Sequence, residues 1–178
     1  MGKHHMTGEL TNMPNRIAIP KLGLSQANRP IDFFVHYADT LDMNPEYQRG
    51  DVWGVTRQKN LWFSLLGGIP IPSIILNSRL ESDFDGPTQY SYGVIDGKQR
   101  ITAILAFVHD RLPLPGDWFS TSGDVHYSDL DQSVQRRITN MALATSEGRL
   151  PSLDAEREVF ELVNYGGVPQ GAADIDIR

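Results

Sequence analysis

The sequence predicts one domain that mixes helices and strands, either as an α/β or as an α+β fold. Stretches with the apolar spacing of helices alternate with short runs typical of buried strands. The 178 residues, 40% of them hydrophobic, are enough for one substantial core but too few for two comfortable domains. We expect a partly flexible N-terminal arm over residues 1–29 and a single domain over residues 30–178.

The first part of the chain is predicted to contain a helix and a buried strand. Residues 17–24 are expected to form a strand or loop that docks on the domain. Residues 31–41 suit a strand by their alternation and a helix by their apolar spacing, and both interpretations stay open. Thr56 can cap a helix over residues 56–66, which two glycines end, and the apolar run at 74–76 predicts the strand.

The second part of the chain is predicted to contain a strand and three helices. A strand over residues 90–95 leads into a helix that starts near residue 97 and extends to about residue 108. The sequence SDLD at 128–131 resembles a capping box and predicts the start of another helix. Apolar spacing predicts a last helix over residues 152–164.

The composition excludes several classes of site. The sequence has no cysteine, which excludes disulfides and thiolate metal sites and fits a reducing cytoplasm, the location we expect. No run is long and apolar enough to cross a membrane. The net charge of -6 argues against a protein that binds DNA alone through a basic face. The domain's three histidines show no metal-ligand spacing: His36, His109 and His126.

The box DGKQR at residues 96–100 combines the features of a phosphate site. A strand ends there, a glycine permits an unusual turn, and a helix begins, so free N–H groups and the helix dipole favour an anion. Lys98 and Arg100 are locally unfavourable at a helix start unless an anion binds there too. The alternative is that Asp96 caps the helix while both cations point to solvent.

A second cluster, PEYQR at residues 45–49, precedes Val52 and Trp53. The planar guanidinium of Arg49 suits a phosphate or a carboxylate. Tyr47 and Trp53 are candidates for stacking on a nucleotide base, and the alternative for each is a place in the core.

Three motifs follow one another along the chain: PEYQRGDVW at 45–53, GIPIP at 68–72 and VIDGKQRITA at 94–103. Their order resembles the group catalogued as domain of unknown function 262, in which the box is usually DGQQR. The segment FELVNYGGVP at 160–169 extends the resemblance, which covers about residues 30–175. The group includes the S-type subunit of GmrSD modification-dependent restriction systems and sensors of phosphorothioate DNA. The resemblance implies a ParB/sulfiredoxin-like fold, a small sheet with flanking helices.

The resemblance also implies nucleoside triphosphate binding and hydrolysis linked to DNA processing, restriction or phage defence. Carried over to this sequence, the catalytic residues would be Asp96, Gln99 and Arg100. The residues that bind the nucleotide and its phosphates would be Gln48, Arg49, Gly97, Lys98, Arg100 and Asn164. We expect a Mg²⁺ ion or another divalent cation, held by Asp96 directly or through water, although Asp96 could instead orient the attacking water. Gln99 could position that water or a phosphate oxygen.

Two departures from the group leave other functions open. Lys98 stands where the group more often has glutamine, and the chain ends at Arg178 without the nuclease half of full-length restriction members. We therefore expect a partner protein, possible contact with DNA and no membrane. The alternatives are a metal-dependent DNA nuclease, a non-catalytic adaptor or inhibitor that keeps the fold, and a kinase. Sulfiredoxin chemistry is excluded, because it needs a cysteine.

Two geometric expectations follow for the arginines of these motifs. Arg49 and Arg100 should approach one cleft. Arg100 should lie exposed in the first turn of its helix, so that its replacement by alanine would leave the fold intact.

Overall fold

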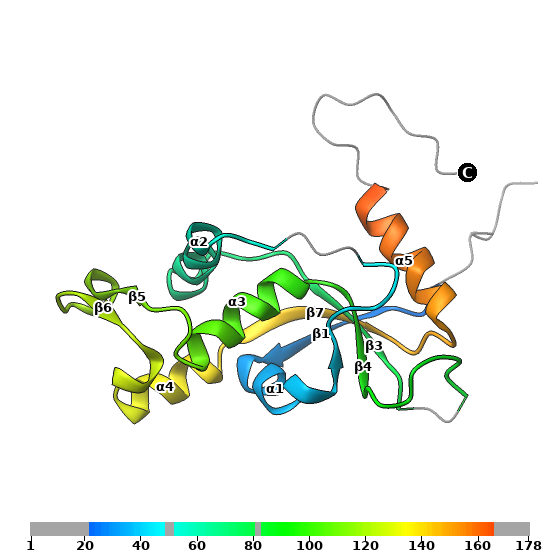
Figure 1. Cartoon of the computed structure of the whole chain (residues 1–178), viewed down its shortest axis with the longest axis horizontal. Helices are drawn as coiled ribbons and strands as arrows, with labels where there is room; N and C mark the ends of the chain where they lie inside the picture. Colours follow the sequence, from blue (N-terminus) through cyan, green and yellow to red (C-terminus); the bar gives the residue numbers. More distant parts are fainter. Residues whose placement is uncertain (1–21, 49–51, 81–82, 166–178) are drawn as a thin grey trace, which may run out of the picture.

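A five-stranded mixed sheet organises the protein (Figure 1). The computed structural model describes residues 22–48, 52–80 and 83–165. The strand order is β1-β7-β3-β4-β2, in which β1 and β7 are antiparallel, β7 and β3 parallel, β3 and β4 antiparallel, and β4 and β2 parallel. The strands are β1 (Ser25–Pro30), β2 (Leu41–Asp42), β3 (Ile74–Ser78), β4 (Tyr92–Asp96) and β7 (Ala142–Gly148). A small hairpin lies apart from this sheet and consists of β5 (Leu114–Pro115) and β6 (Asp124–Val125).

Helices flank the sheet, which confirms the predicted α+β class. They are α1 (Ile31–His36), α2 (Val55–Leu66), α3 (Lys98–Val108), α4 (Gln132–Thr139) and α5 (Leu153–Tyr165). Single 3-10 turns cover Ala38–Thr40, Gly116–Phe119 and Tyr127–Asp129. Within the described ranges, no helix has both the length and the apolar composition needed to span a membrane.

The two faces of the sheet carry two separate cores, because successive side chains of a strand point to opposite faces. Leu76 and Val94 belong to the larger core, which also contains residues of α1, α2 and α3. Ile75 and Ile95 belong to the smaller core, which Val159 of α5 completes with Leu150. The sheet therefore separates α3 from α5, and both helices can reach the end of β4 from different sides.

Several predicted elements are confirmed to within a few residues. These are the helix now seen as α2, the strand β3, the pair β4 and α3, and the last helix α5. The ambiguous segment 31–41 forms α1 followed by a 3-10 turn, because Ile31 and Phe34, three residues apart, both bury their side chains completely.

The helix predicted to open at 128–131 is wrong in its start. Residues Tyr127–Asp129 form only a 3-10 turn, which His126 and Asp129 close with a capping box. Leu130 then adopts an extended conformation, with φ −80 and ψ 144, and this interrupts the helix. The α-helix begins at Gln132 with Asp131 as its N-cap.

Among the strands longer than two residues, β1 and β7 have no counterpart in the sequence prediction. The strand β7 pairs with β1 on one side and β3 on the other, which places it inside the sheet. The strand β1 pairs with β7 over six residues, and its first five, residues 25–29, were assigned to the N-terminal arm by sequence. The expected docked segment at 17–24 lies mostly outside the described residues.

Candidate functional site

The turn between β4 and α3 has the geometry of an anion-binding helix start. Gly97 is the N-cap of α3 with φ 106 and ψ 4, a left-handed conformation that favours glycine. A Cβ at this position would lie 3.0 Å from Cγ1 and from Cγ2 of Ile74. Gly97 and not Asp96 is the N-cap, and no described side chain forms a capping hydrogen bond there, so the interpretation of Asp96 as a cap is wrong. The dipole of the helix still favours an anion at this point.

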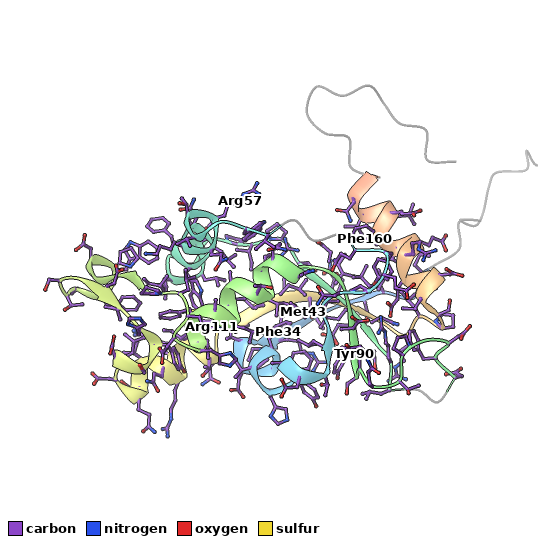
Figure 2. All side chains as sticks on the ribbon, viewed as in Figure 1. Phe34, Met43, Arg57, Tyr90, Arg111 and Phe160 are labelled. Carbon is purple, nitrogen blue, oxygen red and sulfur yellow. The ribbon has the colours of Figure 1, made fainter. Side chains whose placement is uncertain are left out.

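A pocket of about 240 Å³ opens at this helix start. Three separate parts of the chain line it: the segment before α2, the turn into α3 and the face of α5. Its lining residues are Gln48, Trp53, Asp96, Gly97, Lys98, Gln99, Arg100, Phe160 and Asn164. The start of α3 lies between α2 and α5 in Figure 1, and Figure 2 labels Arg57 on α2 and Phe160 on α5 on either side of it. The structure thus gathers every described candidate residue except Tyr47 into one pocket.

Arg100 is far more buried than predicted, with 12% of its side chain exposed. Its Nη2 donates to Asp96 Oδ2 at 2.8 Å and to the Ser73 carbonyl at 3.3 Å. Its Nε is buried and has no hydrogen-bond partner among the described residues. The expectation of an exposed arginine with little structural role is therefore wrong, because Arg100 ties α3 to the chain just before β3.

Gln48 presents a second unsatisfied buried atom at the same pocket. Its Nε2 donates to the Ile95 carbonyl at 3.0 Å, whereas its Oε1 is buried and finds no partner in the described part of the chain. Buried polar groups are nearly always hydrogen-bonded, and leaving one unsatisfied costs roughly 1–3 kcal/mol. A ligand or water that donates a hydrogen bond to Gln48 Oε1 and accepts one from Arg100 Nε would satisfy both atoms.

The rim of the pocket is held by contacts between the starts of α2 and α3. The Trp53 backbone N–H donates to Gln99 Oε1 at 3.0 Å, and Gln58 Nε2 donates to the Trp53 carbonyl at 2.9 Å. The Arg57 guanidinium lies 5.8 Å from the centre of the Trp53 ring. The Lys98 ammonium donates to Asn44 Oδ1. The indole therefore lies beside the residues of the DGKQR box, with a cation over its ring.

Tyr47 and Asn164 differ in how they relate to the pocket. The Tyr47 hydroxyl donates to Glu156 Oε2 at 3.0 Å, and its ring centre lies 5.5 Å from that of Phe160, behind the lining. Burial and the neighbouring Glu156 carboxylate raise the pKa of Tyr47, so its hydroxyl stays protonated. Asn164 lines the pocket from α5, and its Nδ2 donates to the Phe160 carbonyl at 2.8 Å. Arg49 lies outside the described residues, and so does its expected approach to Arg100.

Sequence reasoning missed Phe160 as a lining residue. The signal was present, because Phe160 and Asn164 are four residues apart and share one face of a helix. Arg57, which lies over Trp53, was also missed, and no pattern in the sequence pairs these two residues. Among the described residues, no group of three or more His, Asp or Glu could hold a metal ion, and Asp96 is the one carboxylate in the pocket lining.

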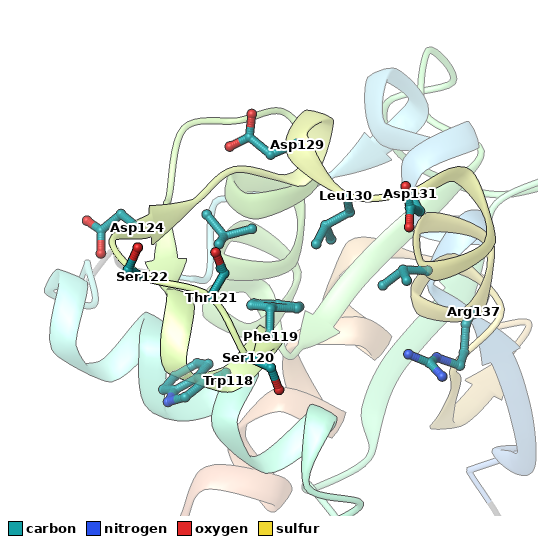
Figure 3. A pocket seen from close by; sticks show the side chains of 12 residues that line it. Trp118, Phe119, Ser120, Thr121, Ser122, Asp124, Asp129, Leu130, Asp131 and Arg137 are labelled. Atoms are coloured by element: carbon teal, nitrogen blue, oxygen red, sulfur yellow. The ribbon is translucent and has the colours of Figure 1, made fainter.

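A larger pocket of about 620 Å³ lies beside the β5–β6 hairpin and α4. Figure 3 shows the carboxylates of Asp124, Asp129 and Asp131 around it, with Trp118 and Phe119 on another side. Its three carboxylates against the single guanidinium of Arg137 disfavour an anion, and none of the candidate site residues named from the sequence is among its lining residues. Volume alone therefore does not identify the site, and the chemistry favours the smaller pocket at α3.

Comparison with known proteins agrees with the motifs. The family model described as GmrSD restriction endonuclease, N-terminal domain, matches residues 31–175. No curated protein and no solved structure matches the chain. Because the matched region includes all the described elements of the pocket and most of the chain, this protein belongs to the GmrSD restriction endonuclease N-terminal domain family.

Proposed function

We propose that the pocket at α3 binds the phosphate groups of a nucleoside triphosphate and promotes its hydrolysis. The family places the chain among restriction and phage-defence proteins that process DNA. The observation that carries the proposal is the left-handed glycine turn at the start of α3 with Lys98 and Arg100 beside it, together with the buried Arg100 Nε and Gln48 Oε1, for which the described residues offer no hydrogen-bond partner.

The charge of the lining supports an anionic ligand. Among the described lining residues, Lys98 and Arg100 bring two positive charges against the one carboxylate of Asp96, in a chain whose net charge is -6. A helix start adds partial positive charge at the same point. Cations gathered at a helix start in an otherwise acidic protein favour phosphate over an uncharged ligand.

The size of the pocket indicates which part of a nucleotide lies inside. Its volume of about 240 Å³ is below the roughly 300–1,000 Å³ of sites that enclose a whole drug-sized ligand. The phosphates would therefore occupy the pocket, while the nucleoside extends to the rim. There Trp53 offers a ring for stacking, with Arg57 beside it.

The residues act by positioning and charge neutralisation, which dominate phosphoryl transfer. Arg100 would turn part of its guanidinium from Asp96 to a phosphate oxygen, and Lys98 would leave Asn44 for another. Asp96 would hold a Mg²⁺ ion, which fits a lining with one carboxylate because Mg²⁺ takes most of its ligands from phosphates and water and neutralises phosphate charge. Gln48 and Gln99 would orient the attacking water.

The direct test measures phosphate release and calorimetric binding with each ribonucleoside triphosphate, with and without Mg²⁺ and DNA. Lys98→Met removes a cation from the lining, and Lys59→Met on α2 is the matched control outside it. Loss of a charge-assisted contact should weaken binding by roughly 1.5–3 kcal/mol, or about 10- to 100-fold. The stability of both variants should stay within about 0.5 kcal/mol of wild type.

The outcomes separate the candidate functions. Equal affinity of the two lysine variants would remove Lys98 from the site. Binding without phosphate release would favour the non-catalytic adaptor. A wild type that binds none of the nucleotides under any of these conditions would overturn the proposal.

A further inference from the structure

A buried network of charges lies beside the pocket, outside the lining. Arg79 donates from Nε to Glu156 Oε1 at 2.7 Å, from Nη2 to Glu156 Oε2 at 2.6 Å, and from Nη1 to Asp42 Oδ2 at 2.8 Å. The exposed fraction of the side chain is 0% for Arg79, 0% for Glu156 and 8% for Asp42. The three charges therefore interact in the interior, on the side of the sheet that faces α5.

The Glu156 carboxylate accepts two further hydrogen bonds. Asn77 Nδ2 donates to its Oε1 at 2.8 Å, and the Tyr47 hydroxyl donates to its Oε2 at 3.0 Å. Gly93 of β4 makes room for the pair: a Cβ there would lie 2.6 Å from Glu156 Oε1 and 2.7 Å from Arg79 Nη2. A glycine in the middle of a buried strand weakens the strand, and here it allows the ion pair to lie directly on the backbone.

Stability alone does not explain such a network. Replacing a buried ion pair by apolar side chains of similar volume is often neutral or stabilising, whereas removing one partner is strongly destabilising because it leaves a buried charge uncompensated. What an ion network provides over an apolar cluster is a fixed geometry, because each donor and acceptor has a direction. The elements that this network joins therefore indicate what it positions.

The joined elements are the walls of the pocket. Glu156 lies four residues before Phe160 and eight before Asn164, so all three share one face of α5. Tyr47 immediately precedes Gln48, whose Oε1 is unsatisfied. The Tyr47–Glu156 hydrogen bond is thus a direct link between the segment that carries Gln48 and the helix that carries Phe160 and Asn164.

We propose that Glu156 is a positioning residue of the pocket, which acts through Arg79 and Tyr47 to hold α5 and Gln48 in register around the bound phosphates. This inference rests on the proposed nucleotide site. Glu156 does not touch the ligand. It sets the distance between two walls of the pocket that lie far apart in the sequence.

The leading test variant is Tyr47→Phe, which removes one hydrogen bond and leaves the Arg79–Glu156 pair intact. Tyr127→Phe is its matched control, because the Tyr127 hydroxyl donates to the Gln135 carbonyl away from the pocket. A second pair is Glu156→Gln with Glu147→Gln, because Glu147 also accepts two bonds from one arginine, Arg29. All variants are made in the whole chain.

Amide hydrogen exchange measures how firmly residues 43–48 and α5, the two walls that the network joins, are held when no nucleotide is present. In Tyr47→Phe we expect exchange to rise about tenfold over residues 43–48 and in α5, the change that about 1.4 kcal/mol of local opening produces. Exchange in α4 should stay at the wild-type value in Tyr47→Phe, and the midpoint of urea unfolding should match that of Tyr127→Phe. Nucleotide affinity should fall about tenfold in Tyr47→Phe and stay at the wild-type value in Tyr127→Phe, and bound nucleotide should restore slow exchange in α5.

The two proposals fail in different ways. Unchanged exchange at 43–48 and in α5, or equal acceleration over the whole chain, overturns the positioning role. Unchanged nucleotide affinity beside accelerated local exchange also overturns it, because the network would then hold elements that binding does not need. If Glu156→Gln unfolds the chain, the Tyr47→Phe variant still tests the positioning role. A wild type that binds no nucleotide overturns the proposed function and, with it, the role of the network in phosphate binding.

Discussion

Replacement of Gly97 by alanine tests whether the turn before α3, where the candidate site lies, requires a glycine. A residue other than glycine held at a left-handed φ costs about 1–3 kcal/mol, and φ at Gly97 is 106. The new Cβ would also lie 3.0 Å from two carbons of the fully buried Ile74, which has little room to move. Alanine reduces the freedom of the unfolded chain, which returns about 0.4–1 kcal/mol. We expect a net loss of roughly 1–3 kcal/mol in the free energy of unfolding.

Gly54→Ala is the matched control, because Gly54 is the N-cap of α2. Its φ is −65, and a Cβ there would meet nothing within 4 Å. Gly54→Ala therefore includes the cost of alanine at an N-cap and the lower entropy of the unfolded chain, but it adds no backbone strain. These two effects nearly cancel, so the free energy of unfolding should change by less than about 0.5 kcal/mol.

Urea unfolding of the wild type and both variants gives the difference directly. Thermal unfolding gives it independently, because 1 kcal/mol shifts Tm by about 2–4 °C for a domain of this size. Gly97→Ala should therefore melt well below Gly54→Ala. Equal stability of the two variants would refute the reasoning that the turn before α3 is strained for any side chain.

Further predictions concern Arg100, Glu147 and Tyr47. Arg100→Ala should lower the free energy of unfolding by roughly 1–3 kcal/mol in urea, because the Asp96 and Ser73 oxygens lose a buried donor; an unchanged midpoint would return Arg100 to a purely ligand-binding role. The hydrogen bond from Arg29 lowers the pKa of Glu147 below its ordinary value of 4.5. The pair therefore contributes its full stability above pH 4.5, and this contribution is lost as pH falls through the lower folded value. Glu147→Gln should therefore flatten the acid side of the stability curve, and parallel curves would contradict this. Burial raises the pKa of Tyr47 above the ordinary value of 10.0. The resulting contribution to stability is complete below pH 10.0 and is lost as pH rises through the higher folded value. In folded protein just above pH 10.0, Tyr47→Phe should leave the tyrosinate absorbance unchanged, and a smaller absorbance than wild type would show that Tyr47 titrates normally.

Local signals explain which elements could be predicted from the sequence. The pair β4 and α3 has an apolar run followed by helical spacing with a glycine between them, so its pattern and its backbone agree. The strand β7 has the sequence ALATSEG, in which only Leu143, Thr145 and Gly148 are buried. It is a strand because β1 and β3 pair with it on both sides, and such long-range pairing leaves little trace in local sequence.

The sequence motifs predicted which residues lie together at the candidate site, but they did not predict how deeply each side chain is buried. Asp96, Lys98 and Gln99 line one pocket with Gln48, as the ordered motifs indicated. The burial of Arg100 could not be predicted, because it depends on the Ser73 carbonyl, which only the fold brings near. The same holds for Glu156, whose place in α5 resembles that of any surface glutamate until Arg79 and Gly93 are placed opposite it.

The three-part lining of the pocket has a consequence for the protein during its synthesis. A nascent chain emerges from the ribosome N-terminus first, at about 5–20 residues per second. Gln48, Trp53 and the DGKQR box are therefore made well before Phe160 and Asn164, which form the remaining wall. A partly translated chain that ends before α5 contains the residues of the turn before α3 but lacks this wall, so the pocket is complete only when α5 has been made and has packed on the sheet.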